Sequence, residues 1–88
     1  MTLSAILLHP DDTVVCLLRD HRAGESAILP TGPTAPLTAD TPMGHKIARV
    51  TIAQGATVVK YGAPIGQATA PIAPGDHVHL HNLRGGLR

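Results

Sequence analysis

Residues 52–62 read IAQGATVVKYG and residues 72–82 read IAPGDHVHLHN, so the pattern I-A-x-G-x-x-V occurs twice, twenty residues apart. RAGES at 22–26 and PMGHK at 42–46 form a weaker pair with the same spacing between their glycines. Glycine adopts positive φ without strain, so each unit predicts a tight turn that leads into a strand. Two such units are too few for a solenoid, and the repeat therefore predicts a compact, pseudo-symmetric β domain in which hairpins fold over one another.

The remaining sequence supports an all-β fold, because short apolar or alternating runs are separated by Gly and Pro and helical spacing is nearly absent. HPDD at 9–12 predicts a hairpin turn, since Pro presets φ and Asp tolerates turn geometry. Residues 30–42 include four prolines, which favours an extended loop or a sheet edge over a central strand. The expected strands are residues 3–8, 13–19, 25–29, 46–50, 57–60, 64–69 and 77–82.

The chain of 88 residues has room for one small domain, which we place at residues 1–83, followed by a flexible tail at 84–88. A domain of this size buries only about 60–65% of the surface that its unfolded chain exposes. Its core must be aliphatic, because the sequence has one tyrosine and neither Phe nor Trp. We therefore expect a partner chain, or self-association into a homo-oligomer, to contribute to its stability.

Composition also excludes some classes of function. The net charge is +1, no basic run is present and a single tyrosine offers little to stack on bases, so nucleic-acid binding is not expected. Cys16 is the single cysteine and lies in the apolar run TVVCLL, which is typical of a buried small hydrophobe. No apolar stretch reaches 18 residues and the first residues lack the basic region of a signal peptide, so we expect a cytoplasmic protein with no membrane contact.

Three histidines at alternate positions, His77, His79 and His81, form the first candidate site. On a strand they would share one face, at about 7 Å between neighbours, so two imidazoles reach one metal ion only if the strand twists or a third ligand helps. Neutral imidazole suits Fe, Zn, Cu and Ni. The alternative is a solvated polar face without a ligand, and the spacing alone leaves both interpretations open.

Two further motifs carry polar side chains beside a glycine turn. In PMGHKI, His45 could donate or accept a proton while Lys46 holds a carboxylate, or both could be exposed turn residues. In VVKYG, Tyr61 could donate a hydrogen bond to an anionic ligand, or it could cover the core while Lys60 is a solvated charge. No nucleophile, carboxylate pair or phosphate loop accompanies these motifs, so the sequence does not assemble a complete active site.

These residues together resemble a known family. The segment TPMGHKIARVTIAQGATVVKYGAPIGQATAPIAPGDHVHLHNL, residues 41–83, is similar to the small N-terminal SAF domain of the altronate and galactarate dehydratases, whose fold is a β-clip. The family pattern runs I-P-x-G-H-K-x-A, then I-x-x-G-x-x-V-x-K-Y-G-x-x-I-G, then I-x-x-G-x-H-V-H-x-H-N, and the one departure is Thr41 at the first position. LLHPDDTVVCLLRD also looks like the opening hairpin, so the resemblance covers residues 3–83.

The resemblance implies a lyase that eliminates water from a 2-hydroxy or sugar acid, or sulfite from sulfolactate. It implies a divalent metal, Fe²⁺, bound mainly by a large catalytic subunit that works with this small subunit or domain. In the related sulfolactate sulfo-lyase the small domain is a separate short subunit. The roles that we assign are catalytic for His45, Lys46 and His79, substrate-binding for Lys60, Tyr61 and Asn82, and metal-binding for His79 and His81.

Two other functions stay open at this stage. SAF-type domains also occur as sugar-acid-binding or partner-binding modules without chemistry, and a free-standing metal-binding protein is a third interpretation. The lyase hypothesis predicts that the isolated chain is inactive and that activity requires the large subunit.

Overall fold

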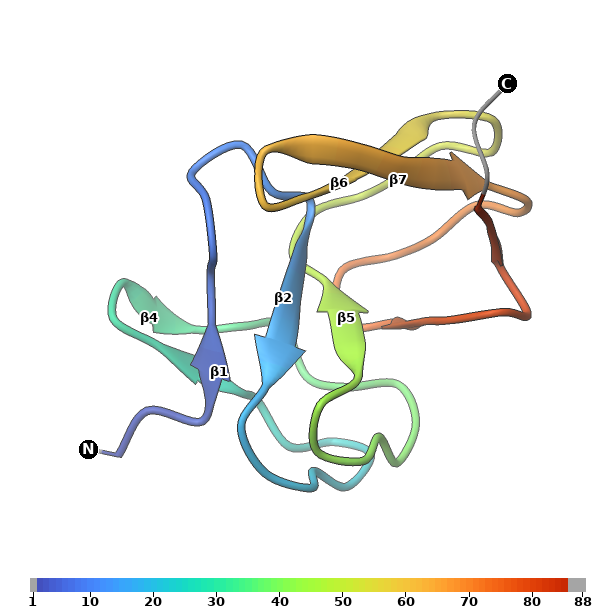
Figure 1. Ribbon diagram of the computed structural model, residues 1–88. Helices are drawn as coiled ribbons and strands as arrows, with labels where there is room; N and C mark the ends of the chain where they lie inside the picture. Colours follow the sequence, from blue (N-terminus) through green and yellow to red (C-terminus); the bar gives the residue numbers. More distant parts are fainter. Residues whose placement is uncertain (1, 86–88) are drawn as a thin grey trace.

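The computed structural model describes residues 2–85 and has no helix among them (Figure 1). Its short strands are all paired antiparallel, so the all-β prediction is confirmed. Within the described residues they form three sheets, with the orders β1-β2-β5-β8, β3-β4 and β6-β7-β9. The strands are β1 (Ala5–Ile6), β2 (Val14–Leu17), β3 (Ile28–Leu29), β4 (Gly32–Pro33), β5 (Lys46–Ala48), β6 (Thr57–Lys60), β7 (Ala63–Ala68), β8 (His77–Val78) and β9 (Leu83–Arg84).

The repeat found in the sequence is the framework of the fold. Ile52 and Ile72, the first residues of the two strong units, exchange backbone hydrogen bonds of 2.9 and 2.8 Å. His21 and Thr41 exchange the same pair of bonds just before the two weaker units. The predicted pseudo-symmetry is therefore real: each repeat pairs with its partner twenty residues away across an antiparallel bridge.

The central four-stranded sheet has a separate hydrophobic cluster on each side. Because side chains alternate along a strand, neighbouring residues of β2, such as Val14 and Val15, enter different clusters. One cluster consists of Ala5, Val15, Leu17, Ala27, Leu29, Leu37 and Ile47. The other consists of Val14, Ala48, Ile52, Val58, Ala68, Ile72 and Val78. As expected, the core is entirely aliphatic within the described residues.

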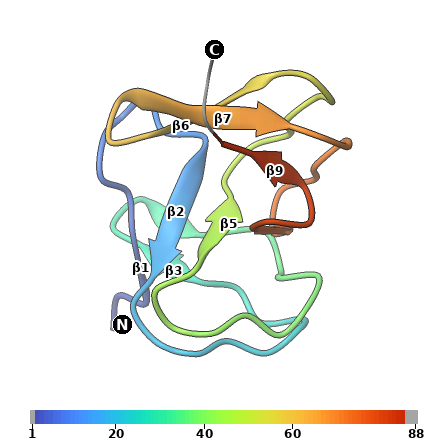
Figure 2. The same cartoon turned by 45° about the vertical axis from the view of Figure 1, so that its right-hand side comes forward.

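The hairpin of β6 and β7 lies across one end of β2 and β5, as both ribbon views show (Figure 2). Asp12, which is fully buried, joins it to the predicted turn at residues 9–12. Its carboxylate accepts the backbone N–H groups of Tyr61, at 3.0 Å, and Gly62, at 2.8 Å. These bonds stabilise Tyr61 in a left-handed conformation, with φ of 58°, at the turn between the two strands.

Several strands are shorter than predicted, and the last one differs in kind. Residues 77–82 do not form one strand: β8 ends at Val78, and residues 79–82 turn back toward β9. The predicted alternation fails with it, since Val78 is fully buried whereas Leu80 is 84% exposed. The proline-rich residues 30–42 contribute only the two-residue β4, which pairs with β3 outside the central sheet, in agreement with the predicted edge.

The last described strand includes one residue of the predicted tail. Arg84 belongs to β9 and pairs with Gln67 of β7. Residues 86–88 of the predicted tail lie outside the described residues.

Across residues 2–85, no helix has the length and apolar character needed to span a membrane.

Candidate functional site

Pairing between β5 and β8 brings three imidazoles together. Ile47 lies opposite His77 and Lys46 opposite Val78, so the same register places His45 opposite His79. The Nδ1 atom of His45 is 2.9 Å from Nε2 of His77, and the ring of His79 is 4.8 Å from that of His45 between centroids. His77 and His79 stack at 5.3 Å with an interplanar angle of 11°. One nitrogen from each of the three rings lies within 4.8 Å of the others.

The turn after β8 holds this histidine cluster (His45, His77 and His79) in place. Asn82 is buried, and its Oδ1 atom accepts the backbone N–H of His79 at 3.0 Å. Its Nδ2 group donates to the backbone carbonyl of His77 at 2.9 Å. The amide of Asn82 thus positions the backbone of two clustered histidines, and the substrate contact that we predicted for it stays a prediction.

Partial burial disfavours the charged form of two clustered imidazoles, His77 and His79. Burial first, and then the neighbouring His45, lowers the pKa of His77. The same two causes, in the same order, lower the pKa of His79. The three rings are half-buried, so their nitrogens are shielded from bulk water without being closed off from a ligand. A neutral imidazole has a free ring lone pair, which can accept a proton or bind a metal.

His81, the third member of the alternating triplet, is exposed and lies at the edge of the cluster. Its ring centroid is 5.5 Å from that of His77, and its nitrogens are not among the three that converge. The predicted metal pair of His79 and His81 is therefore not the set that the structure brings closest together. The structure instead brings His79 together with His45 and His77.

The two predicted lysines and Tyr61 form a second polar group. Lys46 is half-buried, and burial followed by the charge of the nearby Lys60 lowers its pKa. Lys60 also lies over the ring of Tyr61, with 5.7 Å between its Nζ atom and the ring centroid. Tyr61 is 67% exposed, so it does not cover the core. Since neighbouring residues of an extended chain project to opposite sides, His45 and Lys46 leave β5 in different directions.

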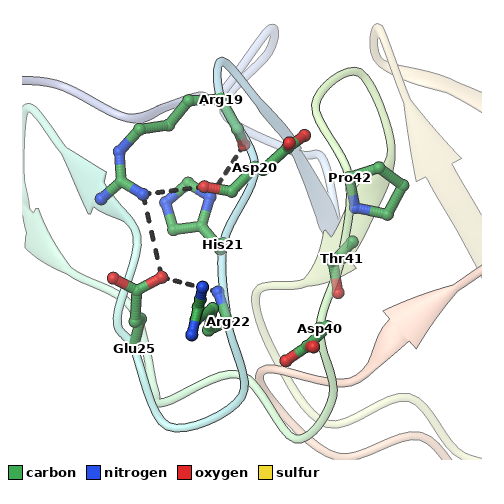
Figure 3. A pocket seen from close by; sticks show the side chains of 8 residues that line it. All are labelled: Arg19, Asp20, His21, Arg22, Glu25, Asp40, Thr41 and Pro42. Carbon is green, nitrogen blue, oxygen red and sulfur yellow. Dashed lines mark hydrogen bonds and ion pairs between the residues drawn. The ribbon is translucent and has the colours of Figure 1, made fainter.

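A cleft that sequence reasoning missed lies between the two weaker repeats. It has a volume of about 590 Å³, and Figure 3 shows one wall formed by residues 19–25 and the other by residues 40–42. The residues that line it are Arg19, Asp20, His21, Arg22, Glu25, Asp40, Thr41 and Pro42. The twenty-residue spacing of RAGES and PMGHK was the signal that these walls would lie side by side.

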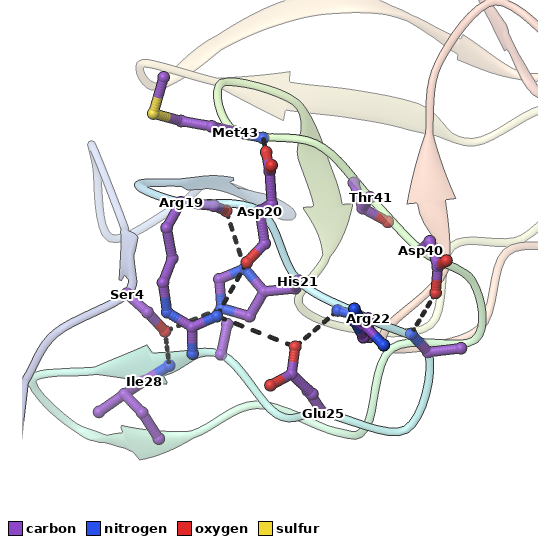
Figure 4. Close-up of polar contacts among 12 residues, drawn as sticks. Ser4, Arg19, Asp20, His21, Arg22, Glu25, Ile28, Asp40, Thr41 and Met43 are labelled. Atoms are coloured by element: carbon purple, nitrogen blue, oxygen red, sulfur yellow. Dashed lines mark hydrogen bonds and ion pairs between the residues drawn. The ribbon is translucent and has the colours of Figure 1, made fainter.

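All three carboxylates that line this cleft accept backbone N–H groups of the glycine turns (Figure 4). Asp20 accepts the N–H of Met43 at 2.7 Å, and Asp40 that of Ala23 at 2.8 Å. Glu25 accepts the N–H of Arg22 at 2.6 Å, which lowers the pKa of Glu25. These acids are used for structure, and the positive charges of the cleft are the groups that remain for an anionic ligand.

His21 lies at the base of the cleft and is a structural histidine. It is buried, and its Nε2 atom contacts the hydroxyl of Ser4 at 3.0 Å. The other ring nitrogen, Nδ1, donates to the carbonyl of Arg19 at 2.9 Å, because a carbonyl oxygen can only accept. In this tautomer Nε2 accepts the hydroxyl proton of Ser4, whose oxygen also accepts the N–H of Ile28. With both nitrogens occupied, His21 is not a candidate for chemistry.

The chain is similar to several proteins of known activity. A family model described as the altronate/galactarate dehydratase SAF domain matches residues 3–86. The altronate dehydratase of Escherichia coli is 45% identical over 82 residues, which is 93% of this chain and 16% of that protein. The Bacillus subtilis altronate dehydratase is 39% identical over 84 residues, or 96% of this chain and 17% of that protein. This chain therefore spans about one sixth of the length of the two dehydratases.

Shorter relatives belong to a different lyase. The alpha subunit of the (2R)-sulfolactate sulfo-lyase from Chromohalobacter salexigens is 44% identical over 43 residues, which is 49% of this chain and 46% of that subunit. The corresponding subunit from Paracoccus pantotrophus is 44% identical over 46 residues, or 52% of this chain and 69% of that subunit.

Proposed function

The chain belongs to the SAF-domain family of the altronate and galactarate dehydratases, and from this premise we propose that it is the small domain of a lyase. Its substrate would be a sugar acid or sulfolactate, from which the lyase eliminates water or sulfite. The observation that carries the proposal is the half-buried histidine cluster at the edge of the β5–β8 pair. All three of its members fall in the motif by which the chain resembles the family.

The chemistry of such an elimination needs a base, an anion-binding group and a way to stabilise the enediolate. His45 and His79 can accept a proton, since each has a half-buried imidazole in the cluster. Lys46 and Lys60 supply positive charge for a substrate carboxylate, with Tyr61 beside Lys60. Fe²⁺, held mainly by the large chain in this proposal, would supply the Lewis acid for the developing negative charge.

The small chain requires a partner in this proposal. Its relatives are either about six times longer or are called subunits, which supports a second, larger catalytic chain. An apolar groove of about 300 Å³ beside β1 offers a surface for such a chain, and Leu3, Ile6 and Leu18 there are more than 40% exposed. Covering such side chains is the usual contribution of a partner to a small domain.

The test is reconstitution with a large dehydratase-like chain. The mixture and each chain alone are assayed for elimination from altronate, galactarate and sulfolactate, with Fe²⁺ added throughout. The proposal expects turnover of one of these acids by the mixture and none by the 88-residue chain alone. Strong turnover by the small chain alone, or no effect of the small chain on the activity of the large one, would contradict it.

A binding module without chemistry is the second candidate, and the cleft between the weaker repeats favours it. Its volume of about 590 Å³ is in the range of small-molecule sites, and Arg19 and Arg22 lie on one wall. Arg19 already contacts the carbonyl of Asp20 and lies 3.8 Å from Glu25, which leaves Arg22 as the better anion ligand. Calorimetric titration of the isolated chain with altronate tests this function. Arg22→Gln should abolish binding, while Arg84→Gln, an exposed arginine on β9, is the matched control.

A further inference from the structure

We propose that His45, His77 and His79 form a metal site of their own, which binds one divalent transition-metal ion in this chain without a partner. This site is distinct from the iron that the proposed function assigns mainly to the large chain. Its failure would leave the lyase proposal standing with His45 and His79 as proton acceptors. Its success would make them metal ligands instead, and the base would then have to come from the large chain.

The distances between the ring nitrogens suit a common ion. Two nitrogens that bind one ion at about 2.0–2.1 Å are about 2.9 Å apart at a 90° angle and about 3.4 Å apart in a tetrahedron. Nδ1 of His45 and Nε2 of His77 are already 2.9 Å apart. The full set lies within 4.8 Å, so the remaining nitrogen needs to approach by only about 1–2 Å.

The fold holds the ligands close before any ion arrives. The antiparallel register of β5 and β8 places His45 close to His77. The third ligand, His79, begins the turn that Asn82 closes. Asn82 hydrogen-bonds the backbone of His77 and His79 and so holds the main chain that carries these two ligands. Little conformational freedom is lost on binding, because these backbone positions are already determined.

The donor set selects the class of ion. Three imidazoles and no carboxylate favour Zn²⁺, Co²⁺, Ni²⁺, Cu²⁺ or Fe²⁺ over Mg²⁺ and Ca²⁺, which prefer oxygen. Lys46 and His81 lie near the cluster and neither is an anion, so affinity depends on the nitrogen bonds rather than on charge attraction. Three protein ligands leave at least one position open to water or to a substrate oxygen.

The simplest alternative is a hydrogen-bonded histidine pair with no ligand. One proton between Nδ1 of His45 and Nε2 of His77 accounts for their 2.9 Å contact. An ion would displace that proton and take both lone pairs. The two interpretations therefore differ in whether an ion binds at a defined stoichiometry and whether all three rings respond to it.

The experiment uses the untagged 88-residue chain after removal of metal by a chelator. Zn²⁺ is titrated by calorimetry, and Co²⁺ by its visible absorption. We expect one ion per chain, and His45→Ala, His77→Ala and His79→Ala should each weaken affinity at least ~10-fold. His9→Ala is the matched control, because His9 is exposed and lies outside the cluster.

A second measurement needs no variant and so does not depend on how the substituted chains fold. In the wild-type chain, paramagnetic Co²⁺ should shift or broaden the imidazole NMR signals of His45, His77 and His79 strongly, and those of His9 far less. The absence of saturable one-to-one binding would overturn the proposal. So would unchanged affinity in the three folded variants, or an equal loss in His9→Ala, because either would place the ion elsewhere.

Discussion

The two equivalent glycines of the strong repeat offer a matched test of the fold. Gly55 and Gly75 occupy the same position in two equivalent turns, with φ of 84° and 91°. Such a left-handed conformation costs an L-residue about 1–2 kcal/mol. They differ in their surroundings. A Cβ added at Gly55 meets no heavy atom within 4 Å, whereas one added at Gly75 would overlap the carbonyl oxygen of Pro36.

The expected magnitudes follow from this difference. Gly55→Ala should lower the free energy of unfolding by about 1–2 kcal/mol, from backbone strain alone. Gly75→Ala should cost about 2–5 kcal/mol, because forced repacking adds about 1–3 kcal/mol. For 88 residues the total stability is of the order of 4–13 kcal/mol, so the second variant could lose most of it.

The assay is urea unfolding of both variants and the wild type, followed by far-ultraviolet circular dichroism. Chevron kinetics are not needed, since the midpoints and slopes give the differences directly. Equal losses in the two variants would refute the reasoning, because they would show that contact with Pro36 does not distinguish the turns. A larger loss in Gly55→Ala would refute it as well.

Four further predictions concern the turns and the imidazoles. Asn82→Ala should cost about 1–3 kcal/mol of stability by leaving buried backbone groups unpaired, and Asn82→Asp, which keeps the acceptor for His79, should recover part of the loss in urea unfolding. Asp12→Ala should cost at least as much, because two N–H groups lose a charged acceptor; an unchanged midpoint would contradict this. Folding lowers the pKa of His77 and His79, so protonation of these rings opposes folding. The free energy of unfolding should therefore be at its full value above about pH 6.5 and decline as the pH falls through the folded-state pKa values. A thermal midpoint that rises from pH 7.5 to pH 5 would refute this. In the reconstituted lyase, His45→Ala or His79→Ala should reduce kcat at least ~100-fold with the circular dichroism spectrum preserved, and full activity in both would mean that the cluster is only a polar surface.

Much of the fold was predictable because its determinants are local. The glycine turns, the turn at residues 9–12 and the aliphatic core each follow from residue types at neighbouring positions. The twenty-residue repeat predicted a pseudo-symmetric domain, whereas the bridge between Ile52 and Ile72 is a finding of the structure. The family motif then placed candidate chemistry on His45 and His79.

The site was only partly predictable, because its members meet through tertiary contacts. No individual role was assigned to His77 from the sequence, yet it lies in the cluster 2.9 Å from His45, which is 32 positions earlier in the chain. The strand expected at residues 77–82 was wrong, because the alternation of His77, His79 and His81 concealed a turn. Asn82 satisfies backbone groups on both sides of that turn, which its position in a motif does not reveal.

The sequence by itself determined where the chain turns, what its core is made of and which family it resembles, since positive φ and side-chain hydrophobicity are properties of single residues. Only the tertiary structure decided which imidazoles share a site, because the register of β5 against β8 brings together His45 and His77, and no local pattern specifies that register. The same is true of the cleft between residues 19–25 and 40–42, whose walls meet across the bridge of His21 and Thr41. Long-range antiparallel pairing, stabilised by the two aliphatic clusters, is the physical reason for both.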